Sequence, residues 1–174
     1  CYFACEVLDE KLYAIGGLVS NSSNHSWDTF DPSTNCWTCH IDPNIASDIE
    51  DSVVLDGKIY VRCVRHPGIT PQVFAVVYEP SSGMWQYADA DMVSGWTGPA
   101  VVVNGTLYVL DQSLGTRLMM WHKERHEWIP VGKLSPLLTK PPCQLVAVGK
   151  RIFIVGKTLS TVVVDVGDLG NEGQ

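Results

Sequence analysis

A six-residue pattern returns four times along the chain at nearly constant spacing. Each copy begins with an aliphatic residue, passes through short polar residues and ends in an aliphatic–aromatic pair. The four copies are Leu8–Tyr13, Leu55–Tyr60, Val103–Tyr108 and Val148–Phe153. The closing aromatic residues stand at positions 13, 60, 108 and 153, so the steps are 47, 48 and 45 residues. A fixed period of this length is typical of repeat architectures, in which each repeat is one small supersecondary unit.

A second landmark recurs in phase with the first. In three of the units an aromatic residue precedes a tryptophan by seven residues. The three pairs are Phe30 and Trp37, Tyr78 and Trp85, and Trp121 and Trp128. Because two independent landmarks keep one register, the chain contains a true internal repeat.

Each unit is predicted to form four short strands. The first hairpin turns at dipeptides such as Asp56-Gly57 and Asn104-Gly105, which tolerate the positive φ of a type I′ turn. The second turns at segments such as Pro32–Asn35 and Pro80–Gly83. We place the units at 2–40, 51–89 and 99–132, with a partial unit at 143–168. No window has a 3.6-residue apolar period, so almost no helix is expected.

The strand sequences indicate how the units pack. Val101–Val103 and Leu107–Leu110 are continuously apolar. A strand that is exposed on one face would alternate instead, so these runs predict burial on both faces. Small sheets that stack face to face around an axis form a β-propeller. We therefore expect an all-β fold over 1–174, a propeller fragment with about three four-stranded blades and part of a fourth.

The period, the aromatic residue in the second strand and the tryptophan in the fourth resemble the kelch repeat. The Gly-Gly pair of that repeat stands at Gly16-Gly17. The other units carry Cys63-Val64, Asp111-Gln112 and Gly156-Lys157 at the matching positions.

Within the kelch proteins, the chain more closely resembles the kelch half of plant F-box/kelch-repeat proteins. The segments that carry this resemblance are Gly95–Pro99, Val103–Tyr108, Trp121–Trp128 and Lys140–Leu145. The resemblance implies a propeller that binds a protein substrate. It also implies an upstream F-box, absent from these residues, that docks a Skp1-like subunit of a ubiquitin ligase.

Composition limits the classes of partner. The net charge is −7, with 12 Lys+Arg against 19 Asp+Glu, and no Lys/Arg cluster occurs, so no nucleic-acid partner is expected. No apolar stretch reaches the roughly 18 residues of a membrane span. The six cysteines lack the spacing of a disulfide-stapled domain, which favours a cytoplasmic or nuclear protein. Since residue 1 is cysteine, we expect a fragment whose natural start lies upstream.

Metal and catalytic motifs are weak. Cys36 and Cys39, followed by His40, resemble half of a zinc site, but a second pair is missing and strand alternation points the two thiols to opposite sides. His122 and His126 flank the hairpin before a repeat tryptophan and are expected to be turn residues. Neither a nucleophile elbow nor a phosphate loop occurs. We expect no bound metal or cofactor and no enzymatic activity.

Recognition is expected on the loops between strands two and three and between units. These loops vary in length, and loops on a rigid scaffold commonly carry binding residues. The candidate partner-binding residues are Arg65, His66, Gln72 and Trp96. Packing between blades is an equal alternative for Trp96. Three functions stay open: the substrate receptor of an SCF-type ubiquitin ligase, a kelch scaffold protein without ligase linkage, and a propeller enzyme or specifier that acts on small molecules.

Overall fold

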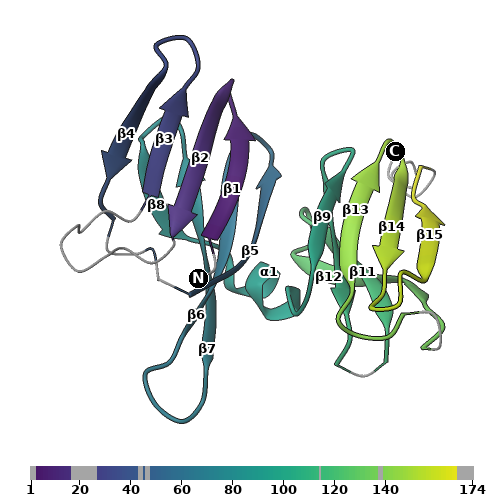
Figure 1. Ribbon diagram of the computed structural model, residues 1–174. Helices are drawn as coiled ribbons and strands as arrows, with labels where there is room; N and C mark the ends of the chain where they lie inside the picture. Colours follow the sequence, from purple (N-terminus) through teal and green to yellow (C-terminus); the bar gives the residue numbers. More distant parts are fainter. Residues whose placement is uncertain are drawn as a thin grey trace. The chain divides into compact units, whose positions relative to one another are not determined.

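The structure is a computed structural model that describes residues 3–16, 27–42, 45, 48–113, 115–136 and 139–167. Four small antiparallel sheets follow one another along the chain (Figure 1). Contacts divide the chain into two compact units, Cys1–Val93 and Ser94–Gln174. Each unit contains two of the sheets.

Within every sheet the strands pair in chain order. The first sheet consists of β1 (Phe3–Leu8), β2 (Lys11–Gly16), β3 (Trp27–Asp31) and β4 (Cys36–His40). The second consists of β5 (Asp48–Leu55), β6 (Lys58–Arg65), β7 (Gln72–Glu79) and β8 (Met84–Tyr87). The third consists of β9 (Ala100–Val103), β10 (Thr106–Asp111), β11 (Arg117–His122) and β12 (Glu127–Lys133). The fourth consists of β13 (Gln144–Val148), β14 (Arg151–Val155) and β15 (Thr161–Asp165).

These sheets are kelch-type propeller blades. The predicted all-β class is confirmed, and the described residues form three four-stranded blades and a three-stranded fourth. In the first unit β1 lies beside β5, and in the second β9 lies beside β13, so the first strands of the two blades within each unit are neighbours. The blade limits that we inferred, and the assignment of 1–174 to one domain, stay predictions.

The first hairpins of the second and third blades have the predicted turn chemistry. Both central residues have positive φ in three of the turns, as a type I′ turn requires. The pairs are Asp9-Glu10 (49° and 61°), Asp56-Gly57 (51° and 70°) and Asn104-Gly105 (50° and 73°). Glu10 stands at the position where the other two turns have glycine. Glycine adopts this left-handed conformation at lower cost than glutamate does.

The two aromatic residues that are seven positions apart form a cross-strand pair in each of three blades. Phe30 lies opposite Trp37, Tyr78 opposite Trp85, and Trp121 opposite Trp128. The ring centroids of the three pairs are 5.1, 5.2 and 5.3 Å apart. Aromatic pairs in such contact contribute about 0.5–1.5 kcal/mol beyond their buried area. Each hairpin between strands three and four therefore carries its own stabilising pair.

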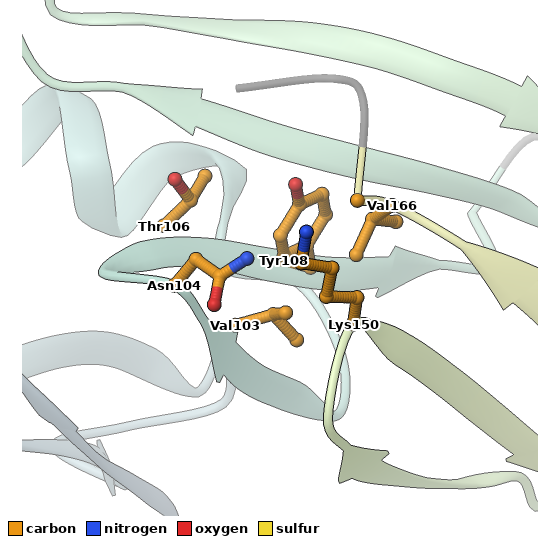
Figure 2. A pocket seen from close by; sticks show the side chains of 7 residues that line it. Val103, Asn104, Thr106, Tyr108, Lys150 and Val166 are labelled. Atoms are coloured by element: carbon orange, nitrogen blue, oxygen red, sulfur yellow. The ribbon is translucent and has the colours of Figure 1, made fainter. Parts of the chain in front are cut away.

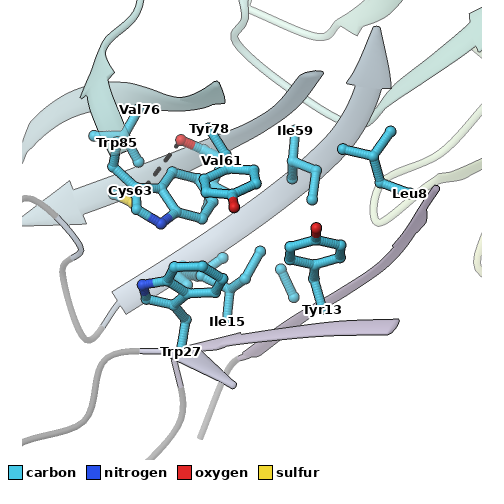
Figure 3. Packing of buried hydrophobic residues seen from close by; sticks show 12 residues of the cluster. Leu8, Tyr13, Ile15, Trp27, Ile59, Val61, Cys63, Val76, Tyr78 and Trp85 are labelled. Carbon is cyan, nitrogen blue, oxygen red and sulfur yellow. Dashed lines mark hydrogen bonds between the residues drawn. The ribbon is translucent and has the colours of Figure 1, made fainter. Parts of the chain in front are cut away.

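The core of the first unit lies between its two blades (Figure 3). Tyr13 and Trp27 of the first blade pack against Tyr78 and Trp85 of the second. The Tyr13 and Tyr78 centroids are 5.4 Å apart, and Trp27 meets Trp85 edge-on at 5.8 Å. Burial raises the pKa of Tyr13 to about 12, and the neighbouring Tyr78 adds to the shift.

The second unit has an equivalent core between its blades. Tyr108, at the repeat position of Tyr13, packs with Leu110 and Leu118 against Ile152 and Ile154. The whole apolar run 107–110 is buried, as its lack of alternation predicts. Both units thus bury the second-strand aromatic residue of one blade against the next blade.

One short helix, α1 (Ala90–Gly95), lies where the sequence predicted a loop between blades. The Asp89 carboxylate caps it by accepting a hydrogen bond from the Asp91 backbone N–H at 2.8 Å. Six residues are too few to give a periodic signal, so only this capping residue marks the helix in the sequence. Among the described residues, no helix has the length and apolar character needed to cross a membrane.

Candidate protein-binding surface

Three of the four candidate residues meet at one hairpin. Arg65 is the last residue of β6 and Gln72 is the first of β7, and the two are direct cross-strand partners. His66 follows Arg65 in the connecting loop. All three are exposed. The structure therefore brings Arg65, His66 and Gln72 together.

This hairpin extends beyond its neighbours in the sheet (Figure 1). The pairing of β5 with β6 ends at Val64, and the pairing of β7 with β8 begins at Val76. The tip, residues 66–71, carries Ile69 fully exposed between two prolines. We call residues 64–75 the projecting hairpin.

Side-chain alternation places an aromatic platform beneath Arg65. Arg65, Phe74 and Tyr87 lie on the sheet face that buries Val76 and Trp85 nearer the first blade. The Arg65 guanidinium carbon lies 4.9 Å from the Phe74 ring centroid, a cation–π distance. The Phe74 and Tyr87 centroids are 6.0 Å apart, and Tyr87 is 61% exposed.

Sequence reasoning missed Phe74 and Tyr87. Their spacing from the repeat residues could have revealed them. Phe74 precedes the repeat residue Tyr78 by four positions, and Tyr87 follows Trp85 by two. Even offsets keep a residue on the same face of a strand. The missing fact was that β6 and β7 run to eight residues each and that the pairing of β7 with β8 begins only at Val76.

Trp96 differs from the other three candidates in its burial. Its side chain is 0% exposed, which fits the packing alternative. The glycines around it are also packed closely. A Cβ on Gly95 would lie 2.2 Å from the Trp128 ring, and one on Gly98 would lie 2.2 Å from the Leu110 carbonyl oxygen. The Gly95–Pro99 segment therefore acts as a packing element.

Asp111 links the Gly95–Pro99 segment to the loop between β10 and β11 through hydrogen bonds. Its carboxylate accepts hydrogen bonds from Ser113 N (3.0 Å), Ser113 Oγ (2.6 Å) and Thr97 Oγ1 (3.3 Å), and it pairs with the Arg117 guanidinium at 2.5 Å. Burial opposes the charge, but the bonds from Ser113 and Arg117 outweigh it and lower the pKa of Asp111 to about 2. Asp111, which stands at the position of Gly16 in the first repeat, thus orders the loop between β10 and β11.

The other chemical candidates belong to strands and turns different from those of the projecting hairpin. Cys36 and Cys39 are exposed free thiols in β4. His122 and His126 bound the β11–β12 turn, and His126 has φ of 50°. The part of the chain that the structure describes contains no group of three or more His, Cys, Asp or Glu side chains placed to hold a metal.

One pocket of about 320 Å³ lies in the second unit. Figure 2 shows Asn104, Tyr108 and Lys150 around it. It opens near the Asn104-Gly105 turn, at the end of β10 opposite the Asp111 loop. Among the described residues that line it, Lys150 and Tyr108 are the ionisable side chains. No nucleophile and base meet there, so this pocket has no catalytic pair among the described residues.

Comparison with known proteins agrees with the geometry. The kelch motif matches residues 1–39. The F-box/kelch-repeat protein SKIP4 of Arabidopsis thaliana is 52% identical over 168 residues, which cover 95% of this chain and 45% of that protein. The F-box/kelch-repeat protein At4g29370 of the same plant is 32% identical over 77% of this chain and 34% of its own length. The chain thus spans less than half of these relatives.

Proposed function

Because this chain belongs, through its kelch repeats, to the plant F-box/kelch-repeat family, we propose that it is the protein-binding module of an F-box adaptor. The module holds a protein substrate at the loop end of its blades. An F-box elsewhere in the whole protein binds a Skp1-like subunit of an SCF-type ubiquitin ligase. The observation that carries this proposal is an exposed, projecting hairpin in a chain that is 52% identical to an F-box/kelch-repeat protein.

The physical task in this proposal is positioning. A ligase gains rate when a target lysine is held near the ubiquitin-charged enzyme, since proximity replaces a bimolecular encounter. A surface built on a buried sheet loses little conformational freedom on binding. The projecting hairpin fits this need because its base is fixed by the core residues Val61 and Val76, which are fully buried.

We further propose that the module acts by binding and not by catalysis, without a metal or cofactor, in the cytoplasm or nucleus. Its partners in this proposal are proteins, and neither nucleic acid nor membrane takes part. The names of the relatives, which describe F-box and kelch proteins, support this choice over a propeller enzyme.

The test uses the full-length protein expressed in plant cells. Affinity purification is expected to recover a Skp1-like subunit, and deletion of the upstream region should abolish that recovery. Arg65→Glu should leave recovery of the subunit unchanged while lowering recovery of those proteins whose half-life lengthens when the adaptor is absent.

Two results would overturn the proposal. If no Skp1-like subunit is recovered, the ligase linkage is wrong and the scaffold hypothesis replaces it. If the subunit is recovered but no co-purifying protein changes its half-life when the adaptor is removed, the protein is not a substrate receptor.

A further inference from the structure

Arg65 differs from every other arginine that the structure describes. Arg62 pairs with Glu50, Arg117 with Asp111, Arg125 with Glu127, and Arg151 with Asp165. Within the described ranges Arg65 has no carboxylate partner, and its recorded contact is the Phe74 ring. A guanidinium ion held on a ring keeps its in-plane N–H donors free for an anion.

The segment that carries Arg65 has an unusual composition of charged residues for this chain. Residues 61–78 include two arginines and one histidine but no aspartate or glutamate. The whole chain has a net charge of −7. Since Arg62 is already paired, Arg65 is the cation in this segment that can attract an acidic partner.

The apolar neighbours define the rest of the partner. Tyr87 stands beside Phe74 on the same face and is mostly exposed, and Ile69 is fully exposed at the tip. Trp, Tyr and Arg are the residue types that dominate binding energy at protein interfaces. An apolar side chain of a partner could pack on Tyr87 while its neighbouring carboxylate reaches Arg65.

We propose that the Arg65–Phe74–Tyr87 surface binds an acidic segment of a partner protein, in which a carboxylate pairs with Arg65 and an adjacent apolar side chain packs on Tyr87. This inference rests on the proposed function, because it names the chemistry of the substrate segment. Arg65 supplies selectivity for the anion, and the Phe74 ring fixes the guanidinium before the partner arrives, which lowers the ordering cost of binding.

The test presents a display library of random 12-residue peptides to the full-length protein. Selected peptides are expected to carry Asp or Glu next to an apolar residue. Their synthetic forms should bind at least tenfold more weakly to Arg65→Glu and Arg65→Gln in a fluorescence polarisation titration, and binding should weaken with added salt.

Matched variants separate this surface from general charge and apolar effects. Arg125→Glu makes the same charge change at an exposed arginine on the β11–β12 turn, and Met84→Ala removes an exposed apolar side chain from the strand that carries Tyr87. Both should bind within twofold of the unmodified protein, whereas Tyr87→Ala should lose about tenfold. Circular dichroism confirms that each variant is folded.

Three outcomes would overturn the inference: selected peptides without acidic residues, equal binding by Arg65→Glu, or tighter binding of a 12-nucleotide poly-dT probe than of any peptide. Recovery of the Skp1-like subunit is measured on the same preparations. If that subunit is recovered while the acidic peptides fail, this inference is wrong and the proposed function stands. If the subunit is not recovered but Arg65-dependent acidic peptides are found, the proposed function fails and the surface assignment stands.

Discussion

Asp111 offers a sharp test of what orders the loop between β10 and β11. Asp111→Asn keeps the size of the side chain but removes its charge, so the Arg117 ion pair and the strong bonds from Ser113 are lost or weakened. Hydrogen bonds to charged groups contribute about 1.5–3 kcal/mol each, and breaking a buried pair costs more when one charge is left behind. Because Arg117 is partly exposed, we expect a loss of about 2–4 kcal/mol in local stability.

Asp165→Asn is the matched control. Like Asp111 and Arg117, Asp165 and Arg151 are cross-strand partners in the second unit, with Arg151 Nε 3.4 Å from Asp165 Oδ2. The Asp165 side chain, however, is 64% exposed, against 8% for Asp111. Exposed pairs contribute about 0–1 kcal/mol, so this change should have little effect.

Hydrogen–deuterium exchange of the full-length protein measures the difference. A loss of 2–4 kcal/mol corresponds to roughly 30- to 1000-fold faster exchange in peptides covering residues 108–118. The same peptides should change little in Asp165→Asn. Equal exchange in both variants would show that the buried carboxylate does not hold the loop and would refute the reasoning.

Three further predictions concern single side chains in the first two blades. Trp85→Ala, at a site 2% exposed, should lower the free energy of unfolding by about 3–5 kcal/mol, whereas Trp37→Ala, at the equivalent site 55% exposed, should cost far less in the same urea titration. Glu10→Gly should raise the melting temperature, because glycine adopts the left-handed conformation without strain, and we expect a gain of about 0.5–1 kcal/mol in the free energy of unfolding. Gly57→Glu should lower the melting temperature for the same reason. Shifts of the opposite sign would contradict the turn assignment. Burial lowers the pKa of His40, so its protonation opposes folding. The contribution of His40 to the free energy of unfolding should be constant above pH 6.5 and fall below it. His40→Gln should therefore flatten the pH dependence of the melting temperature in this range.

Local features of the fold could be predicted from the sequence. The Asp56-Gly57 turn and the Tyr78–Trp85 pair follow from interactions within one hairpin, where spacing alone fixes which residues meet. The burial of Tyr108 followed from the lack of alternation in its strand. These signals involve neighbours in the chain, so one sequence is enough to read them.

Features that depend on tertiary packing could not be predicted in the same way. Trp96 is of a residue type that is enriched at interfaces, but it is fully buried, and the adjacent Gly95 packs against Trp128, more than 30 positions away. The platform under Arg65 depends on how far β6 and β7 extend past β5 and β8. Strand length is the least certain property of a sequence pattern, because each end is decided by the neighbouring strand.

The projecting hairpin has a consequence for how such a surface can change in evolution. Because side chains alternate along a strand, adding one residue to β6 and one to β7 would turn the next residues to the opposite face. Adding two to each strand would move the pair formed by Arg65 and Gln72 outward by about 7 Å and keep it on the same face. The reach of the hairpin can therefore be adjusted in steps of two residues per strand without altering the groups that it displays, which lets one scaffold fit targets of different depth.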